Sequence, residues 1–130
     1  MKPTLPACAA LAMLLSGCEA LMFGNVIVGC AMRPTPEVLP RELPVATVGE
    51  PYSVQIEVIN ASTPLGNLQV IPDKPLPDGL ELVHDERQKH AVIQGTPRAA
   101  GRYDVQLHGW TYGTQCTGQD IDKLYRLEVR

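Results

Sequence analysis

Strict alternation of apolar and polar residues is the feature that most limits what this 130-residue chain can fold into. It is clearest in residues 52–59, 102–108 and 125–130. Because successive side chains of a β-strand point to opposite faces, each segment would have one apolar face for a core and one polar face for solvent. From residue 34 onward we find no helical periodicity long enough to predict a helix. The pattern therefore predicts a protein built from strands.

Four shorter segments complete the predicted set of strands. They are residues 67–71, 80–84 and 90–94, and an extended stretch within residues 38–48. Prolines at positions 34, 36, 40 and 44 favour an edge position for the extended stretch, since proline lacks the N–H that a sheet ladder needs. The 11 glycines and 12 prolines suit a turn-rich β protein. Seven short strands within about 95 residues predict an all-β sandwich.

Five short motifs follow one another between residues 48 and 129. They are Val48-Gly49-Glu50-Pro51-Tyr52-Ser53, Leu76-Pro77-Asp78-Gly79-Leu80-Glu81-Leu82, Ile93-Gln94-Gly95-Thr96-Pro97, Ala100-Gly101-Arg102-Tyr103 and Tyr125-Arg126-Leu127-Glu128-Val129. In this order they resemble the bacterial immunoglobulin-like domain that is similar to the cadherin-like repeats of dystroglycan type. The resemblance covers about residues 36–130 and implies an immunoglobulin-like β-sandwich of about seven strands. It implies little about activity, because this fold carries many functions.

Two of the motifs have a direct physical meaning. Asp78 and Gly79 form a predicted turn before the next strand, because aspartate tolerates and glycine prefers a positive φ. Tyr103 begins a predicted strand just after a crossover and resembles a tyrosine corner, which implies a hydrogen bond from its hydroxyl to nearby backbone. Both features belong to the scaffold.

The start of the chain has the layout of an export signal. Lys2 is followed by an apolar run over residues 5–15 and then by small residues. At about 1.5 Å per residue, a helix of that run is too short for a hydrocarbon core of about 30 Å. Leu15-Ser16-Gly17-Cys18 resembles a bacterial lipobox, which implies cleavage before Cys18 and a diacylglycerol group on it. We expect a signal peptide over 1–17, a lipidated N-terminus and tether over 18–35, and a domain over 36–130.

Two alternatives to this interpretation stay open. Ile27-Val28-Gly29-Cys30 also fits a lipobox, but cleavage at Cys30 would need an unusually long signal. Cys18 could instead be a buried, unmodified cysteine. Removal of Lys2 with the signal leaves 10 basic and 14 acidic residues, a net charge of −4. Because this charge does not favour an anionic membrane surface, we expect the protein to be attached to the membrane through covalent lipid. Glu19 in place of aspartate favours outer-membrane sorting under the usual enterobacterial rule.

The cysteines predict one disulfide. Cys8 would leave with the signal and Cys18 would take the lipid, so Cys30 and Cys116 remain. Two remaining thiols in an exported protein are expected to pair. The chain has no Cys-x-x-Cys motif and no histidine-rich cluster near these cysteines, which argues against a metal or redox pair.

The charges and candidate catalytic groups argue against two classes of function. With 11 basic and 14 acidic residues and no basic cluster, the chain does not fit a nucleic-acid binder. Ser53 and Ser62 lack the Gly-x-Ser-x-Gly context of an activated nucleophile, so we expect no enzyme and no cofactor.

Two groups of residues are weak candidates for a metal site. His84 and His90 flank a polar turn, and such histidines are more often solvent-exposed than metal ligands. Asp120 and Asp122 have the carboxylate spacing seen in calcium sites, but a lone domain lacks the domain junction at which some cadherin-like relatives bind calcium. We expect no metal.

Trp110 and Tyr112 are the candidate contact residues. Aromatic side chains at a loop end either contact a ligand or protein, or cap the core beneath the loop. Our main hypothesis is a lipid-anchored envelope lipoprotein with a non-catalytic immunoglobulin-like module that contacts an envelope protein, facing the periplasm or the exterior. The alternative is a surface lipoprotein that binds a small ligand, sugar or calcium near residues 110–116.

Overall fold

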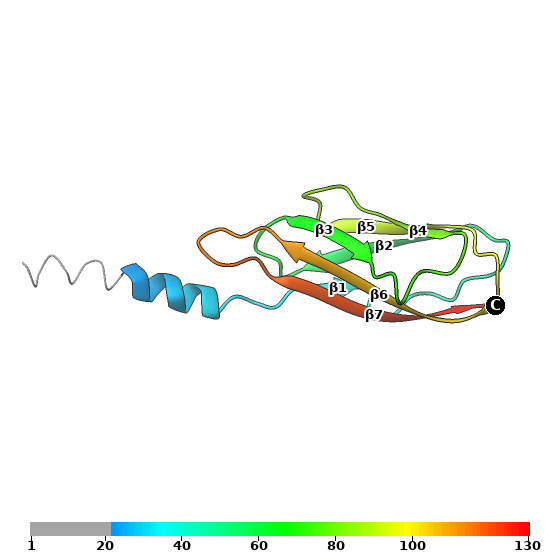
Figure 1. The fold of residues 1–130 in the computed structure, drawn as a ribbon, viewed down its shortest axis with the longest axis horizontal. Coiled ribbons are helices and arrows are strands. Elements are labelled where there is room, and N and C mark those ends of the chain that lie inside the picture. The colour runs from blue at the N-terminus through cyan, green and yellow to red at the C-terminus, as the bar shows by residue number, and fades with distance from the viewer. Residues whose placement is uncertain (1–21) are drawn as a thin grey trace, which may run out of the picture. The chain divides into compact units, whose positions relative to one another are not determined.

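A computed structural model describes residues 22–130 (Figure 1). The chain divides into two compact units, residues 1–33 and residues 34–130. In the first unit, residues 22–31 are helical, where the sequence predicted only a tether. The predicted signal peptide and Cys18 lie outside the described residues. Within residues 22–130, no helix is long and apolar enough to cross a membrane.

The second unit is an antiparallel β-sandwich, which confirms the predicted fold class. Its strands in chain order are β1 (Glu37–Leu39), β2 (Tyr52–Ile59), β3 (Leu65–Val70), β4 (Leu80–Val83), β5 (His90–Gly95), β6 (Gly101–Thr111) and β7 (Asp120–Val129). One sheet has the order β1-β2-β5-β4 and the other has the order β3-β6-β7 (Figure 1). This is the strand order of the seven-stranded, constant-type immunoglobulin fold.

The core forms where alternate residues of the two sheets meet. Its largest fully buried side chains include Ile56 and Ile93 from the first sheet, and Leu107, Tyr125 and Leu127 from the second. Each has an exposed or half-buried neighbour on both sides along its strand. The alternation in the sequence therefore marks the core face of these strands.

The segment after β1 crosses from one sheet to the other. β1 is an edge strand, as its prolines predicted, and the chain leaves it at the cis peptide bond between Leu39 and Pro40. Ala46 then forms a parallel bridge with Val129 of β7. The prolines cannot donate to a sheet ladder, and they lie in a segment that pairs first with one sheet and then with the other.

Both scaffold motifs adopt the expected geometry. The Tyr103 hydroxyl donates a hydrogen bond to the carbonyl of Ala99 at 3.0 Å, as expected for a tyrosine corner. Gly79 has a φ of 96°, and a Cβ on it would lie 1.9 Å from the carbonyl oxygen of Thr96. The turn after Asp78 therefore requires glycine for both conformation and space.

The last two strands are longer than predicted. The prediction limited each strand to the residues with regular alternation, but the strands continue where the polarity pattern reverses. In β6, Gly109 and Thr111 are buried while Trp110 is exposed. In β7, the half-buried Lys123 precedes the exposed Leu124. β7 therefore begins at Asp120 instead of residue 125, and Trp110 lies within a strand rather than at a loop end.

Candidate functional site

Trp110 lies on the outer face of the β3-β6-β7 sheet. It is 41% exposed, and the residues on either side of it in β6 are buried. Its ladder neighbours are Asn67 in β3 and Asp120 in β7. Because strand residues alternate between faces, this side chain points away from the core. The structure therefore does not place Trp110 as a cap over the core.

A glycine beneath Trp110 provides the space for its ring. A Cβ built on Gly66 would lie 1.9 Å from Trp110 Cζ3 and 2.4 Å from Cε3. The pairing register of β3 with β6 shifts between Leu65 and Asn67, at this glycine. The indole therefore covers bare backbone at an irregularity of the sheet.

Tyr112 packs against Trp110 although it lies just beyond β6. The two ring centroids are 5.2 Å apart, and the rings form an angle of 83°. This edge-to-face arrangement is favourable for aromatic pairs. The Tyr112 N–H donates to the carbonyl of Pro64 at 3.0 Å, and the Thr63 hydroxyl donates to the Tyr112 carbonyl at 2.7 Å. Backbone bonds thus fix the position of Tyr112.

The loop between β4 and β5 completes this surface. The Arg87 guanidinium carbon lies 5.2 Å from the centroid of the Tyr112 ring, a cation–π distance. The Tyr112 hydroxyl donates a hydrogen bond to the Glu86 carboxylate, and this bond raises the pKa of Tyr112. The Arg87 N–H donates to the carbonyl of Leu65 at 2.9 Å. We refer to Arg87, Trp110 and Tyr112 as the aromatic cluster.

The sequence predicted Trp110 and Tyr112 but missed Arg87, Glu86 and Gly66. The β4–β5 loop reads as an ordinary polar turn, and only the sandwich brings it to the end of β6. Gly66 has Pro64 shortly before it and Asn67 after it, so the sequence indicates a turn here and gives no sign of an aromatic ring above the glycine. A contact role for Trp110 and Tyr112 stays a prediction.

Cys30 and Cys116 form the predicted disulfide. Because a disulfide persists in an oxidising compartment, this pair agrees with an exported protein. Cys18, the predicted lipid-attachment residue, is outside the described part of the chain.

The weak metal candidates do not converge in the structure. The Nε2 atom of His84 lies 2.8 Å from the carbonyl oxygen of Gln88, and His108 Nδ1 lies 2.9 Å from Asp122 Oδ1. Asp120 and Asp122 occupy outward positions of β7 rather than a loop. Over residues 22–130, no group of three or more His, Cys, Asp or Glu side chains could hold a metal ion.

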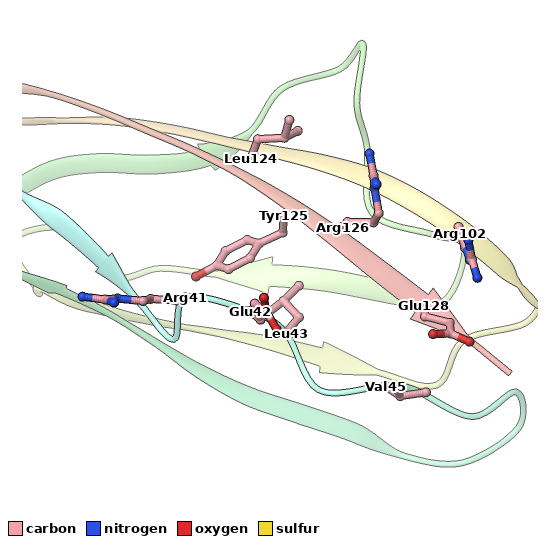
Figure 2. Close-up of a pocket in the computed structure, with 9 residues that line it drawn as sticks. All are labelled: Arg41, Glu42, Leu43, Val45, Arg102, Leu124, Tyr125, Arg126 and Glu128. Atoms are coloured by element: carbon pink, nitrogen blue, oxygen red, sulfur yellow. The ribbon is translucent and has the colours of Figure 1, made fainter.

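A second surface feature is a hollow beside β7, with a volume of about 530 Å³ (Figure 2). Leu43 and Val45 line it from the segment after β1, and Leu124 and Arg126 line it from β7. The hollow exists because the chain crosses between sheets here and leaves part of the β7 edge uncovered.

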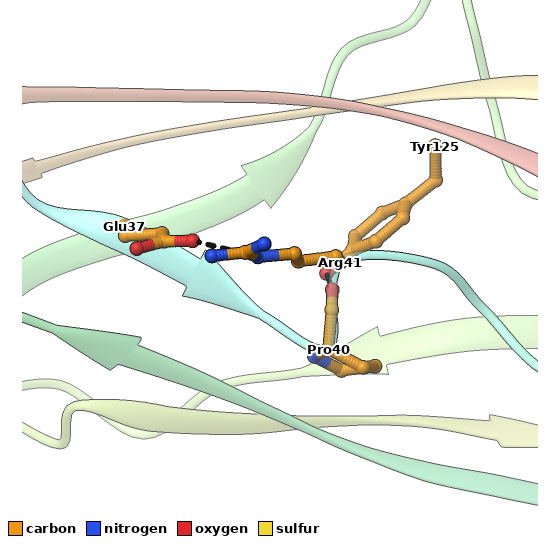
Figure 3. A network of polar contacts seen from close by, with 4 residues as sticks. All are labelled: Glu37, Pro40, Arg41 and Tyr125. Atoms are coloured by element: carbon orange, nitrogen blue, oxygen red, sulfur yellow. Dashed lines mark hydrogen bonds and ion pairs between the residues drawn. The ribbon is translucent and has the colours of Figure 1, made fainter.

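Two polar contacts secure the crossing segment near this hollow (Figure 3). The Tyr125 hydroxyl donates to the carbonyl of Pro40 at 2.6 Å, and Arg41 Nε lies 3.2 Å from a carboxylate oxygen of Glu37. The buried Tyr125 bond connects the segment to β7, whereas the exposed ion pair is a surface contact.

No protein-family model and no curated protein sequence matches the chain. Among solved structures, the sialic acid binding region of a Streptococcus sanguinis SK1 adhesin bound to 3'sLn has a TM-score of 0.58 at 15% identity, covering 76% of this chain and 30% of that chain. The SrpA adhesin from Streptococcus sanguinis has a TM-score of 0.52 at 14% identity, with coverages of 75% and 58%. An endo-fucoidan hydrolase from glycoside hydrolase family 107 has a TM-score of 0.55 at 19% identity, with coverages of 74% and 14%. This chain spans less than two thirds of each, and at these identities the likeness shows the fold alone.

Proposed function

We propose that the protein is a non-catalytic immunoglobulin-like binding module that contacts an envelope protein through the aromatic cluster. The observation that carries this proposal is the exposed Trp110, which is held over Gly66 and against Tyr112. Tryptophan, tyrosine and arginine are the residue types that dominate binding energy at protein interfaces. Because the Tyr112 ring already packs against Trp110 and its hydroxyl already bonds to the Glu86 carboxylate, little side-chain entropy would be lost on contact.

We further propose that a lipid on Cys18 anchors the module to the bacterial envelope, at the outer membrane. The tetrapeptide over residues 15–18 and Glu19 support this assignment. The disulfide between Cys30 and Cys116 supports export to an oxidising compartment. The order of the five turn and strand motifs supports membership of the bacterial cadherin-like immunoglobulin domains.

A second candidate is a glycan ligand on the same surface. Gly66 lies under one face of the Trp110 ring, and the ladder neighbours Asn67 and Asp120 are polar. An exposed indole face beside hydrogen-bonding side chains suits the apolar face and hydroxyl groups of a sugar ring. One structure with this fold is an adhesin region bound to 3'sLn, which makes that glycan a reasonable first probe.

Replacing Trp110 with alanine tests the contact surface. The full chain, its Trp110→Ala variant and a Gln69→Ala control on the same sheet would be used to capture proteins from envelope extracts and to probe a glycan array. We expect Trp110→Ala to weaken binding at least tenfold, since truncation of a central tryptophan typically costs about 2 kcal/mol or more. Gln69→Ala should bind normally. Equal capture by all three proteins, each shown to be folded by circular dichroism, would contradict the proposal.

Intact mass of the membrane-extracted protein tests the anchor. We expect a chain that starts at Cys18, carries diacylglycerol and acyl groups, and lacks two hydrogens because of the disulfide. A Cys18→Ala variant should keep its uncleaved signal. A lipid mass on Cys30, or an uncut unmodified chain in the native protein, would refute the assignment.

A further inference from the structure

The outer edge of β7 has backbone groups that face away from its partner β6. In an antiparallel pair, the backbone groups of successive residues point alternately toward and away from the partner. At the end of β7, the Glu128 carbonyl accepts a hydrogen bond from Ala46 N–H and the Arg130 N–H donates to the Ala46 carbonyl, both at 2.9 Å. Even-numbered residues of β7 therefore direct their N–H and C=O groups to the outer edge.

This edge is open over the first two thirds of the strand. By the same alternation, Asp122, Leu124 and Arg126 direct their backbone groups outward, and within residues 22–130 no backbone partner lies on them. Leu124 is 50% exposed and borders the hollow in Figure 2. The edge is therefore both unpaired and accessible.

The other sheet edges are shorter or partly covered. β1 has three residues and β4 has four. The carbonyl of Leu65, at the start of β3, accepts a hydrogen bond from Arg87 N–H. β7 thus has the longest open edge among the described strands, and such an edge is a template for another strand.

We propose that two copies of this chain pair through their β7 edges, antiparallel, with Leu124 of one copy opposite Leu124 of the other. The two Leu124 residues would form a hydrogen-bonded pair, because the N–H and C=O of each face the edge. Asp122 of each copy would lie opposite Arg126 of the other copy. The result is a continuous six-stranded sheet with a two-fold axis at Leu124.

In this register the charged residues nearest the two-fold axis are complementary. Asp122 and Arg126 are equally far from Leu124, so the two-fold axis brings each carboxylate opposite a guanidinium. Both side chains are exposed, and at the surface Asp122 contacts His108 and Arg126 contacts Asp104. Opposite charges in directly facing cross-strand pairs favour association.

Lys123 selects against the neighbouring registers. It occupies an inward position of β7, with its ammonium nitrogen 5.1 Å from the centroid of the Tyr125 ring. In the proposed register Lys123 faces Tyr125 of the other copy. Centring the axis on Lys123 places two ammonium groups opposite each other. Centring it on Tyr125 places Leu124 opposite Arg126, so the two Asp122–Arg126 pairs are lost. A one-residue slip would exchange the faces of the strand.

Charge reversal followed by mixing tests the pairing. The full chain in detergent would be studied by sedimentation velocity over a range of concentrations, alone and as the variants Asp122→Arg and Arg126→Asp. We expect the native chain to dimerise, and each variant alone to dimerise about tenfold or more weakly, because each then has only like charges opposite each other. An equimolar mixture of the two variants should dimerise as well as the native chain, since it restores two opposite pairs.

A crosslinking pair gives an independent readout. Leu124→Cys should be joined to a second copy by a short bismaleimide in intact membranes, because facing residues of a hydrogen-bonded pair have Cα atoms about 5.5 Å apart. Gln69→Cys, at the exposed position of β3, is the matched control and should crosslink no more than the unaltered chain.

Three results would overturn the proposal. The first is a native chain that is monomeric at every concentration. The second is a dimer that persists in both charge-reversal variants, which would indicate two copies sharing a micelle or another face. The third is equal crosslinking at positions 69 and 124. Dimerisation is measured without any ligand, so it fails or succeeds separately from binding at Trp110.

Discussion

Gly66 is the single residue on which the geometry of the aromatic cluster depends most directly. Its φ is not in the left-handed region, so alanine is compatible with the backbone there, but the new Cβ would overlap the Trp110 ring. We expect Gly66→Ala to displace the indole and to weaken binding at this surface. Because the ring lies at the surface and can move, the free energy of unfolding should change by less than about 1 kcal/mol, the lower end of overpacking costs.

Fluorescence measures this displacement directly, since Trp110 is the only tryptophan. The emission maximum of Gly66→Ala should shift to longer wavelength as the ring becomes more exposed. Gln69→Ala, an exposed change in the same strand, should leave the spectrum unchanged. An unaltered spectrum in Gly66→Ala would show that the ring does not depend on the glycine.

At the scale of elements, two tyrosines secure the segment that crosses between the sheets. The Tyr52 hydroxyl donates to the carbonyl of Pro44 at 2.9 Å, and the Tyr125 hydroxyl donates to the carbonyl of Pro40 at 2.6 Å. Burial raises the pKa of each phenol to about 12, and for Tyr125 the proximity of Tyr52 adds to the rise. Both phenols therefore stay protonated in the folded protein above the ordinary value of 10.0.

This difference makes stability depend on alkaline pH. Between pH 10 and about 12 the unfolded chain has released these protons and the folded chain has kept them, so the free energy of unfolding falls as pH rises. Below pH 10 the contribution is fully present. We expect a Tyr52→Phe, Tyr125→Phe double variant to be less stable at neutral pH by about 1–3 kcal/mol for two lost hydrogen bonds, and to lose less stability across this window.

Urea unfolding at a series of pH values measures the effect, with each sample unfolded soon after the pH change so that disulfide exchange is limited. The comparison between native and variant chains removes the contribution of lysine and arginine titration. Parallel declines in the two proteins would show that the phenols do not carry the dependence.

The last two strands illustrate why element boundaries were harder to predict than elements. Lys123 faces inward and Leu124 faces outward, which inverts the usual polarity, so the sequence predicted β7 from residue 125 rather than from Asp120. Trp110 and Gly109 invert the polarity at the end of β6 in the same way. At both places the strand continues because backbone pairing with a neighbour sustains it, not because its side chains favour it.

At the scale of the whole molecule, the disulfide closes a loop of about 85 residues that includes all six strands before β7. Loss of this constraint increases the conformational entropy of the unfolded chain, which stabilises the unfolded state by about 4 kcal/mol in the chain-entropy model. We expect a Cys30→Ser, Cys116→Ser double variant to lose about 2–5 kcal/mol of unfolding free energy. Urea unfolding of the native, reduced and variant chains would measure it.

Reduction of the native chain should lower its stability by the same amount as the double substitution. The variant itself should not respond to reductant. Identical unfolding curves for the oxidised and reduced native chain would show that the disulfide contributes nothing to stability.

The sequence by itself determined the fold class, the approximate position of all seven strands and the pairing of Cys30 with Cys116. These features follow from local rules: a period of two along a strand, glycine and proline at turns, and the fate of cysteines in an exported chain. The same rules located Trp110 and Tyr112 as candidates, because aromatic residues outside the apolar pattern stand out in any sequence.

Only the tertiary structure decided what surrounds those residues. Arg87, Gly66 and Tyr112 are far apart in the chain, and the sandwich brings them to one end of β6. The open edge of β7 likewise depends on where the chain crosses between sheets, because the crossing segment bonds to the β7 backbone only from Ala46 onward. Local sequence patterns record the face on which a side chain lies, whereas neighbours and uncovered edges are set by contacts between distant segments.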